Sequence, residues 1–318
     1  MLTDEYEYKI ELKIKNLLEG KSLQNWCKDI SNNFLVETEQ TTPPFSITKF
    51  LPHRNIKALH DENLSLTGKI EKKQNGFLLK LNPKKIKSGQ YYNFVLAHEI
   101  AHTFFYDVNS PEPIDISGLV PSSFYLEYLC NKIARYLLIP AKSIEEEIEN
   151  IPSIESYEFN LSYVSILLEK YNTSSFTFLT RIIVDEPLWN AVFIRFKYFD
   201  ETSNWKLTET YKPRYLNPSE FFIPLPDKNK HFDNPHKFPT AKSNLNSFLQ
   251  ELYKDLLVKK RLNKIIDAKE IKGAPLETFL NKFPDDFKLL LHTSVHKETN
   301  TINILIPLSN FMNEETSL

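Results

Sequence analysis

The amino-acid sequence predicts an α+β fold for the first half of the chain, then a short helical segment, then an α/β pattern in the second half. The 318 residues exceed the usual size of one compact domain, which favours two domains. Apolar residues at 41% and charged residues at 25% exclude a disordered chain, a collagen-like repeat and a coiled-coil rod. Segments with strand-like alternation and segments with helical periodicity occur in both halves, so neither half is all-α or all-β.

The composition also excludes several function classes. Six glycines, with no GxGxxG or P-loop string, argue against a nucleotide-binding fold that depends on clustered glycines. The net charge of -2 gives no overall attraction to nucleic acid or to an anionic membrane. Any such binding is therefore expected to be local.

Three features predict a cytoplasmic protein that does not enter a membrane. Residues 1–5 are acidic where a signal peptide would be basic and then apolar. No run of 18 apolar residues occurs. Cys27 and Cys130 are too few for a disulfide framework, and both lie in stretches with helical spacing, so a reducing compartment is expected.

The first half is predicted to hold helices and a small sheet. Residues 6–18 fit both a helix and a strand, and their Glu and Lys residues favour a helix that ends at Gly20. The other elements expected before the long helices are a strand over 45–51, after Pro43 and Pro44, and a hairpin of 65–70 with 77–82, turned at Asn75 and Gly76.

Two long helices and one short helix complete this half. Residues 91–106 contain no Pro or Gly and are apolar around most of the helix, so this helix is predicted to be buried. The next helix, residues 123–138, is preceded by Pro121 and stopped by Pro140. A short acidic helix is expected over 144–150.

A boundary is predicted near Ile151 and Pro152. Helical spacing over 161–184, interrupted at 171–175, then indicates a helix, a turn and a helix. The elements expected beyond it are strands over 189–199, 205–211, 288–294 and 301–307, and a helix over 242–266. The predicted domains are thus residues 1–148, 150–185 and 186–318.

The most informative motif is an HExxH inside the buried helix, formed by His98, Glu99 and His102. The two histidines lie about 40° apart on one helix face, one turn from each other, so both can reach a single ion. Glu99 projects to the side, where its carboxylate can take a proton from a metal-bound water. The alternative is a pair of core histidines bonded to carbonyls, but three polar side chains on an apolar helix are costly to bury without partners.

A hydrolytic zinc site needs a third protein ligand, and Glu127 is the best candidate. It lies on the next helix, 25 residues after His102, which leaves enough chain for a loop and an antiparallel return. The nearer acids fit less well, because Asp107 lies beyond the metal-facing turn and Glu112 and Asp115 lie in a Pro-rich loop.

Two other residues share the helix face of Glu127. Asn131, one turn further on, can hold the Glu127 carboxylate or a ligand histidine as an outer partner, or be a surface amide. Cys130 can approach the metal as a soft ligand, or be a small buried residue. The sequence leaves these alternatives open.

These residues lie in two strings, NFVLAHEIAHTFFY (Asn93–Tyr106) and EYLCNKIARYLLIP (Glu127–Pro140), which resemble the paired signatures of the ImmA/IrrE metallopeptidases. The preceding GFLLKLN is similar to that family's strand before the helix. The resemblance implies a gluzincin-like zinc metallopeptidase domain, with Zn²⁺ held by His98, His102 and Glu127 and with Glu99 as the base. Departures from the family pattern at Asn93, Cys130 and Tyr106-Asp107 leave these four positions intact.

The resemblance also implies a biological setting. The expected substrate is a helix-turn-helix repressor, whose loss releases a response to stress, DNA damage, mobile elements or phage. In several family members a GAF-like regulatory domain follows, and residues 186–318 are compatible with one that senses a nucleic-acid or small-molecule signal.

Two other interpretations stay open. A DNA-binding regulator with a structural metal site would read DNA with residues 161–182, but only Lys170 and Arg181 lie near that turn, too few for strong phosphate binding. An inactive metallopeptidase fold that only binds its partner is opposed by the intact Glu99.

Overall fold

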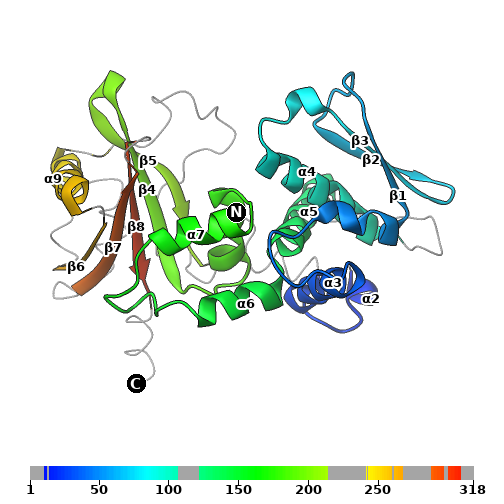
Figure 1. The fold of residues 1–318 in the computed structure, drawn as a ribbon, viewed down its shortest axis with the longest axis horizontal. Helices are drawn as coiled ribbons and strands as arrows, with labels where there is room; N and C mark the ends of the chain where they lie inside the picture. The colour runs from blue at the N-terminus through cyan, green and yellow to red at the C-terminus, as the bar shows by residue number, and fades with distance from the viewer. Residues whose placement is uncertain are drawn as a thin grey trace. The chain divides into compact units, whose positions relative to one another are not determined.

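The computed structural model describes residues 11–12, 14–106, 122–213, 241, 243–259, 261–267, 288–296 and 300–308. These residues form an α+β fold with eight α-helices, a three-stranded mixed sheet and a five-stranded antiparallel sheet (Figure 1). They belong to two compact units. Unit 1 comprises Met1–Asn150 and Ile166–Arg181, and unit 2 comprises Ile151–Ser165 and Ile182–Leu318.

The helices of unit 1 begin at clear sequence signals. Helices α3 (Leu23–Glu37) and α4 (Gly89–His102) follow Ser22 and Ser88, whose hydroxyls accept a hydrogen bond from the backbone N–H three residues on. The other helices of unit 1 are α2 (Lys15–Leu18), α5 (Ser122–Leu138), α6 (Ala141–Glu149) and α8 (Ser175–Leu179). Helix α7 (Ser162–Lys170) begins in unit 2 and ends in unit 1. The predicted helices are present in this unit, but the one predicted over 91–106 ends at His102 and continues as a 3₁₀ helix over Thr103–Phe105, and the one predicted up to residue 184 changes to a π-helix after Leu179.

The three-stranded sheet contains the predicted hairpin. Strands β2 (Gly68–Lys73) and β3 (Gly76–Leu81) pair antiparallel, and β1 (Ile56–His60) pairs parallel to β3 on its other side. Gly76 has a φ of 140°, and a Cβ on it would lie 2.2 Å from the Asn55 carbonyl oxygen, so the turn requires glycine. The sequence did not indicate β1, because four of its five residues are exposed and show no alternation.

The strand predicted for residues 45–51 is wrong. Ile47–Phe50 forms the 3₁₀ helix η1, in which Ile47 and Phe50 are buried three residues apart. The Gln40 side-chain amide accepts from the Ser46 N–H at 2.6 Å and donates to the Ser46 carbonyl at 3.3 Å. Backbone groups that a strand would offer to a neighbour are thus used within the loop. The other 3₁₀ helices are η2 (Pro52–Arg54), η3 (Pro83–Lys85), η4 (Thr103–Phe105) and η6 (Asp200–Thr202), and η5 (Thr180–Asp185) is a π-helix.

Helix α4 is the centre of unit 1. It packs against β2 and against α5 (Figure 1). Leu96, Ala97, Ile100 and Ala101 are each at most 1% exposed. The predicted burial is therefore confirmed for the second half of this helix, where Glu99 is 8% exposed, whereas residues 89–91 at its start are exposed.

The sheet of unit 2 corrects two predictions. Its strands run in the order β5-β4-β8-β7-β6 and every described pair is antiparallel, so this half is α+β and not α/β. The helix predicted over 242–266 ends at Lys259, and its last part is instead strand β6, because pairing with β7 at seven positions outweighs local helical spacing. The elements are β4 (Ala191–Phe199), β5 (Asn204–Tyr211), α9 (Ser243–Lys259), β6 (Arg261–Asp267), β7 (Lys288–His296) and β8 (Thr301–Pro307).

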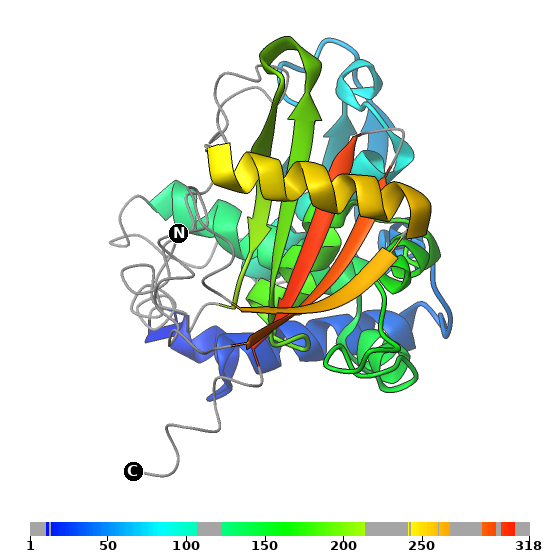
Figure 2. The same cartoon turned by 90° about the vertical axis from the view of Figure 1, so that its left-hand side faces the viewer.

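Helix α9 lies across one face of this sheet (Figure 2). Leucines at helical spacing, Leu245, Leu249, Leu252 and Leu256, are 0–5% exposed and belong to one apolar cluster with the sheet. Their partners in the cluster include Val192, Ile194, Phe196, Trp205, Leu207, Ile302, Ile304 and Ile306.

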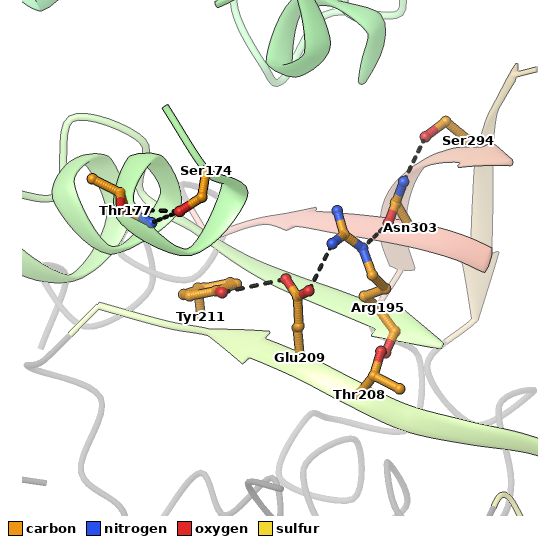
Figure 3. A network of polar contacts seen from close by, with 8 residues as sticks. All are labelled: Ser174, Thr177, Arg195, Thr208, Glu209, Tyr211, Ser294 and Asn303. Carbon is orange, nitrogen blue, oxygen red and sulfur yellow. Dashed lines mark hydrogen bonds and ion pairs between the residues drawn. The ribbon is translucent and has the colours of Figure 1, made fainter. Parts of the chain in front are cut away.

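A row of polar side chains crosses the other face of the sheet (Figure 3). Arg195 lies between Ile194 and Phe196 of the apolar cluster, so its side chain projects away from α9. Its guanidinium donates to Glu209 on β5 and to Asn303 on β8, both at 2.7 Å. The Asn303 amide in turn donates to the Ser294 hydroxyl on β7 at 3.4 Å. Four strands are thus joined by side chains as well as by backbone hydrogen bonds.

None of the helices in the described part of the chain has the length and apolar character needed to cross a bilayer.

Replacing Leu249 with alanine is expected to lower the free energy of unfolding by about 2–5 kcal/mol, because it leaves a cavity under α9. Val258 on the same helix is 84% exposed, and its replacement with alanine should change stability by less than about 0.5 kcal/mol. Denaturant unfolding followed by tryptophan fluorescence measures both, since Trp205 lies in the same cluster. Equal effects of the two substitutions would contradict the packing described for α9.

Candidate metal centre

Three side chains from α4 and α5 meet at one point. His98 and His102 lie one turn apart on α4, with their Nε2 atoms 3.2 Å from each other. Glu127 on α5 places one carboxylate oxygen 3.1 Å from the Nε2 of His98 and the other 3.5 Å from the Nε2 of His102. The structure thus brings together the three residues that the sequence indicated as ligands.

The spacing of these atoms fits a zinc ion. Two ligands that each lie ~2.0–2.1 Å from a zinc ion at the tetrahedral angle stand ~3.3 Å apart. The two Nε2 atoms, 3.2 Å apart, lie close to that value, and the Glu127 carboxylate places one oxygen 3.1 Å from His98 and the other 3.5 Å from His102. Two imidazoles and one carboxylate are also a common ligand set of hydrolytic zinc. The alternative of two core histidines bonded to carbonyls does not match, because both Nε2 atoms face the carboxylate.

Asn131 orients one of the histidines. Its side-chain oxygen lies 3.0 Å from the Nδ1 of His98. A neutral His98 that donates from Nδ1 to this oxygen has its Nε2 lone pair free for a metal. Of the roles that the sequence left open for Asn131, the structure has the contact with a ligand histidine.

The charges of the three ligands depend on one another. Burial, together with the neighbouring His98, lowers the pKa of His102 to about 4. Burial would also lower the pKa of His98, but the hydrogen bond and charge of Glu127 outweigh it and the pKa is raised. The hydrogen bond from His98 holds the pKa of Glu127 below its usual value. Without a metal, a proton in this group is thus held more readily by His98, beside Glu127, than by His102.

Glu99 stands apart from the three ligands. It is 8% exposed, and burial raises its pKa to about 7. Its carboxylate also accepts a hydrogen bond from the backbone of Ile70 on β2. A carboxylate with a pKa near neutrality can accept and release a proton at physiological pH.

Strand β2 approaches Glu99 more closely than most residues would permit. A Cβ on Gly68 would lie 2.8 Å from a Glu99 carboxylate oxygen and 2.9 Å from a Val95 methyl carbon. Glycine at this position therefore lets the strand close over Glu99. Sequence reasoning missed this contact, although a glycine within a strand is a signal of close backbone approach.

The end of α4 has its own support. The Arg54 guanidinium donates to the Thr103 carbonyl at 2.8 Å and to the Thr103 hydroxyl at 3.1 Å, and it lies 4.4 Å from the centre of the Phe104 ring. Thr103 follows His102, so a cation stabilises the carbonyl end of the helix beside a candidate ligand. Nothing in the sequence pattern indicated this role.

Cys130 is not among the converging ligand atoms. In the described part of the chain, the group whose ligand atoms lie within 4.8 Å of one another is His98, His102 and Glu127. The Cys130 side chain is fully buried, and burial raises the pKa of its thiol well above the usual value. Of the two roles that the sequence left open, the structure has the small buried residue. Asp107, Glu112 and Asp115 lie outside the described residues.

The candidate ligands line a cleft of about 570 Å³. Its polar part is formed by the three ligands, Glu99 and Asn131. The remaining wall comes from β2, from the segment before it, from the first two turns of α4 and from Tyr106. A volume of this size is typical of sites that bind small molecules or a few peptide residues.

Comparison with known proteins assigns no family. No family model matches the chain, and no curated protein matches it. A solved structure of a Mycobacterium tuberculosis transcriptional regulator is similar with a TM-score of 0.43 and 10% identity, over 94% of this chain and 92% of that chain. Similarity at this level carries no argument about function.

Replacing Gly68 with alanine is expected to destabilise the protein by about 1–3 kcal/mol, because the added methyl group clashes with Glu99 and Val95. Gly89 is the matched control: it has open space around its Cβ position and lies at the start of α4, so alanine there should be neutral or slightly stabilising. Thermal unfolding of both variants measures the difference. An unchanged melting temperature for Gly68→Ala would show that β2 does not press on Glu99.

Proposed function

We propose that this protein is a zinc-dependent endopeptidase. The observation that carries the proposal is the convergence of His98, His102 and Glu127 at zinc-ligand spacing, beside a separate buried carboxylate, Glu99. When bound at such a site, zinc polarises a peptide carbonyl and lowers the pKa of a water molecule.

The residues of the chain supply the rest of the chemistry. Glu99 takes a proton from the attacking water and returns it to the leaving amine, a role that suits a carboxylate whose pKa is raised by burial. Asn131 fixes the tautomer and ring orientation of His98 through the 3.0 Å contact. Arg54 holds the last turn of α4, which carries His102.

We expect the substrate to bind as an extended peptide alongside β2. Within the described residues β2 is an edge strand of its sheet, and its residues Gly68, Lys69 and Ile70 line the cleft beside the ligands. A peptide that lies alongside this strand passes the candidate metal centre with its backbone exposed to the ligands and to Glu99.

The partner and the setting rest on the sequence resemblance alone. By analogy with the ImmA/IrrE metallopeptidases, the substrate is a helix-turn-helix repressor in the cytoplasm. In this proposal, residues 186–318 form the sensor, which responds to a nucleic-acid or small-molecule signal of stress, phage or DNA damage.

The alternative of a DNA-binding regulator finds little support in the helices α7 and α8. Arg181 is fully buried, with its guanidinium 3.6 Å from the centre of the Tyr136 ring and its Nε donating to the Ile139 carbonyl. Lys170 is paired with Glu147. Neither basic side chain near the turn is presented to a phosphate backbone.

Purified, chelator-free protein is expected to contain one zinc per chain, and His98→Ala and Glu127→Ala should each lose it, because two ligands bind zinc far more weakly than three. Plasma mass spectrometry measures the metal content. His60→Ala is the control, since His60 is exposed on β1 and lies outside the ligand group. Absence of metal from the wild type, or equal loss in the control, would overturn the site.

Glu99→Gln is expected to keep the zinc and to lower peptide cleavage by about 10²–10⁴-fold, because glutamine cannot take up the proton. A quenched fluorescent peptide library, read with wild type and variant at equal zinc content, measures this effect. Cleavage at the wild-type rate in the variant would rule out Glu99 as the base.

A further inference from the structure

One wall of the cleft at the candidate metal centre is apolar. Leu66, Tyr91, Phe94, Ile70 and Val95 line this part of the cleft, beside the candidate ligands. Leu66 is 56% exposed and Tyr91 is 40% exposed. Single exposed apolar side chains are common, but these two come from different segments and border the same cleft.

The apolar wall is continuous with the candidate ligands. Tyr91, Val95, His98 and His102 recur at helical steps along one face of α4. The Phe94 ring lies with its centre 6.3 Å from that of His98. At 1.5 Å per residue, Tyr91 is ~10 Å along the helix from His98, so the wall begins at the ligands and extends for about two turns.

The backbone around Leu66 is fixed by hydrogen bonds on both sides. The side-chain amide of Asn82, a residue that is 2% exposed, donates to the carbonyls of Glu62 at 3.1 Å and Leu64 at 2.8 Å. The Asn82 N–H donates to the Thr67 carbonyl at 2.9 Å, and the Lys85 ammonium donates to the Ser65 carbonyl. Leu66 is therefore held in an exposed position, which lowers the entropic cost of contacting an occupant.

The charges around the wall indicate what the occupant is. Among the described residues that line the cleft, Lys69 is the lysine, and its ammonium is paired with the Glu71 carboxylate at 3.2 Å. Among the described lining residues the other charged groups are the candidate ligands and Glu99, so a charged side chain placed against Leu66, Tyr91 and Phe94 would lose water without a charged partner among these three residues. An uncharged, bulky side chain would instead bury the exposed apolar surface.

We propose that this wall is a specificity site, which binds the side chain of one bulky apolar residue, of the size of leucine or phenylalanine, next to the cleaved bond of an extended peptide. The inference rests on the proposed peptidase function. It adds the class of residue that the enzyme selects.

The test uses probes that share one zinc-binding group. The zinc-loaded full chain is titrated calorimetrically with three hydroxamates. Acetohydroxamic acid has no side group, 3-phenylpropanohydroxamic acid has an apolar phenyl group, and 6-aminohexanohydroxamic acid has a charged amino group. We expect the phenyl probe to bind at least about tenfold more tightly than acetohydroxamic acid, and the amino probe to show no such gain.

Variants assign the gain to the wall. The double substitution Leu66→Ser with Tyr91→Ser should bring the affinity ratio of the phenyl and acetyl probes close to one and leave acetohydroxamic acid binding unchanged. Leu59→Ser is the matched control, because Leu59 is an exposed leucine on the same sheet that does not line the cleft. Melting temperatures and zinc content verify that each variant is folded and loaded.

Each outcome is distinct. Equal binding of the phenyl and acetyl probes, or a ratio that survives the double substitution, overturns the specificity site and leaves the zinc centre standing. Failure of every hydroxamate to bind overturns the proposed function, and the specificity site with it.

Discussion

The packing of α4 against α5 is the contact on which the candidate site depends. Both helices are buried along this seam, and His98 and His102 from one helix meet Glu127 from the other only at the separation that this packing sets. The side chains of His98 and His102 are only 15% and 17% exposed, whereas that of Glu127 is 55% exposed. Because the two histidines lie beside buried side chains such as Ala97 and Ile100, they need polar partners, which Glu127 and Asn131 provide.

The site was readable from the sequence where its geometry is local. The four-residue interval of His98 and His102 fixes their shared helix face, and the position of Glu127 on a second buried helix made it the strongest third ligand. The contributions of Gly68, Ile70 and Arg54 were not readable, because each reaches the helix from a distant part of the chain. Their contacts depend on how β2 and the segment before β1 pack against α4. The spacing of apolar residues along the sequence gives no information about that packing.

The fold shows the same division between local and non-local information. Helices with clear caps, such as α3 and α4, and the hairpin of β2 with β3 follow local patterns. Predictions failed where a partner decides the conformation. Residues 261–267 carry helical spacing, yet they are a strand because β7 lies beside them, and residues 47–50 form a 3₁₀ turn because Gln40 binds the backbone at Ser46.

The polar row of unit 2 bears on how reliably its sheet assembles. In a strand, a shift of one residue moves every side chain to the opposite face. Such a slip of β4 would turn Arg195 toward the leucines of α9, where a guanidinium has no partner, and would expose Ile194 and Phe196. Glu209 and Asn303 would at the same time lose their donor. The polar row therefore favours the native register of β4, since a misaligned sheet loses both its ion pair and its apolar core.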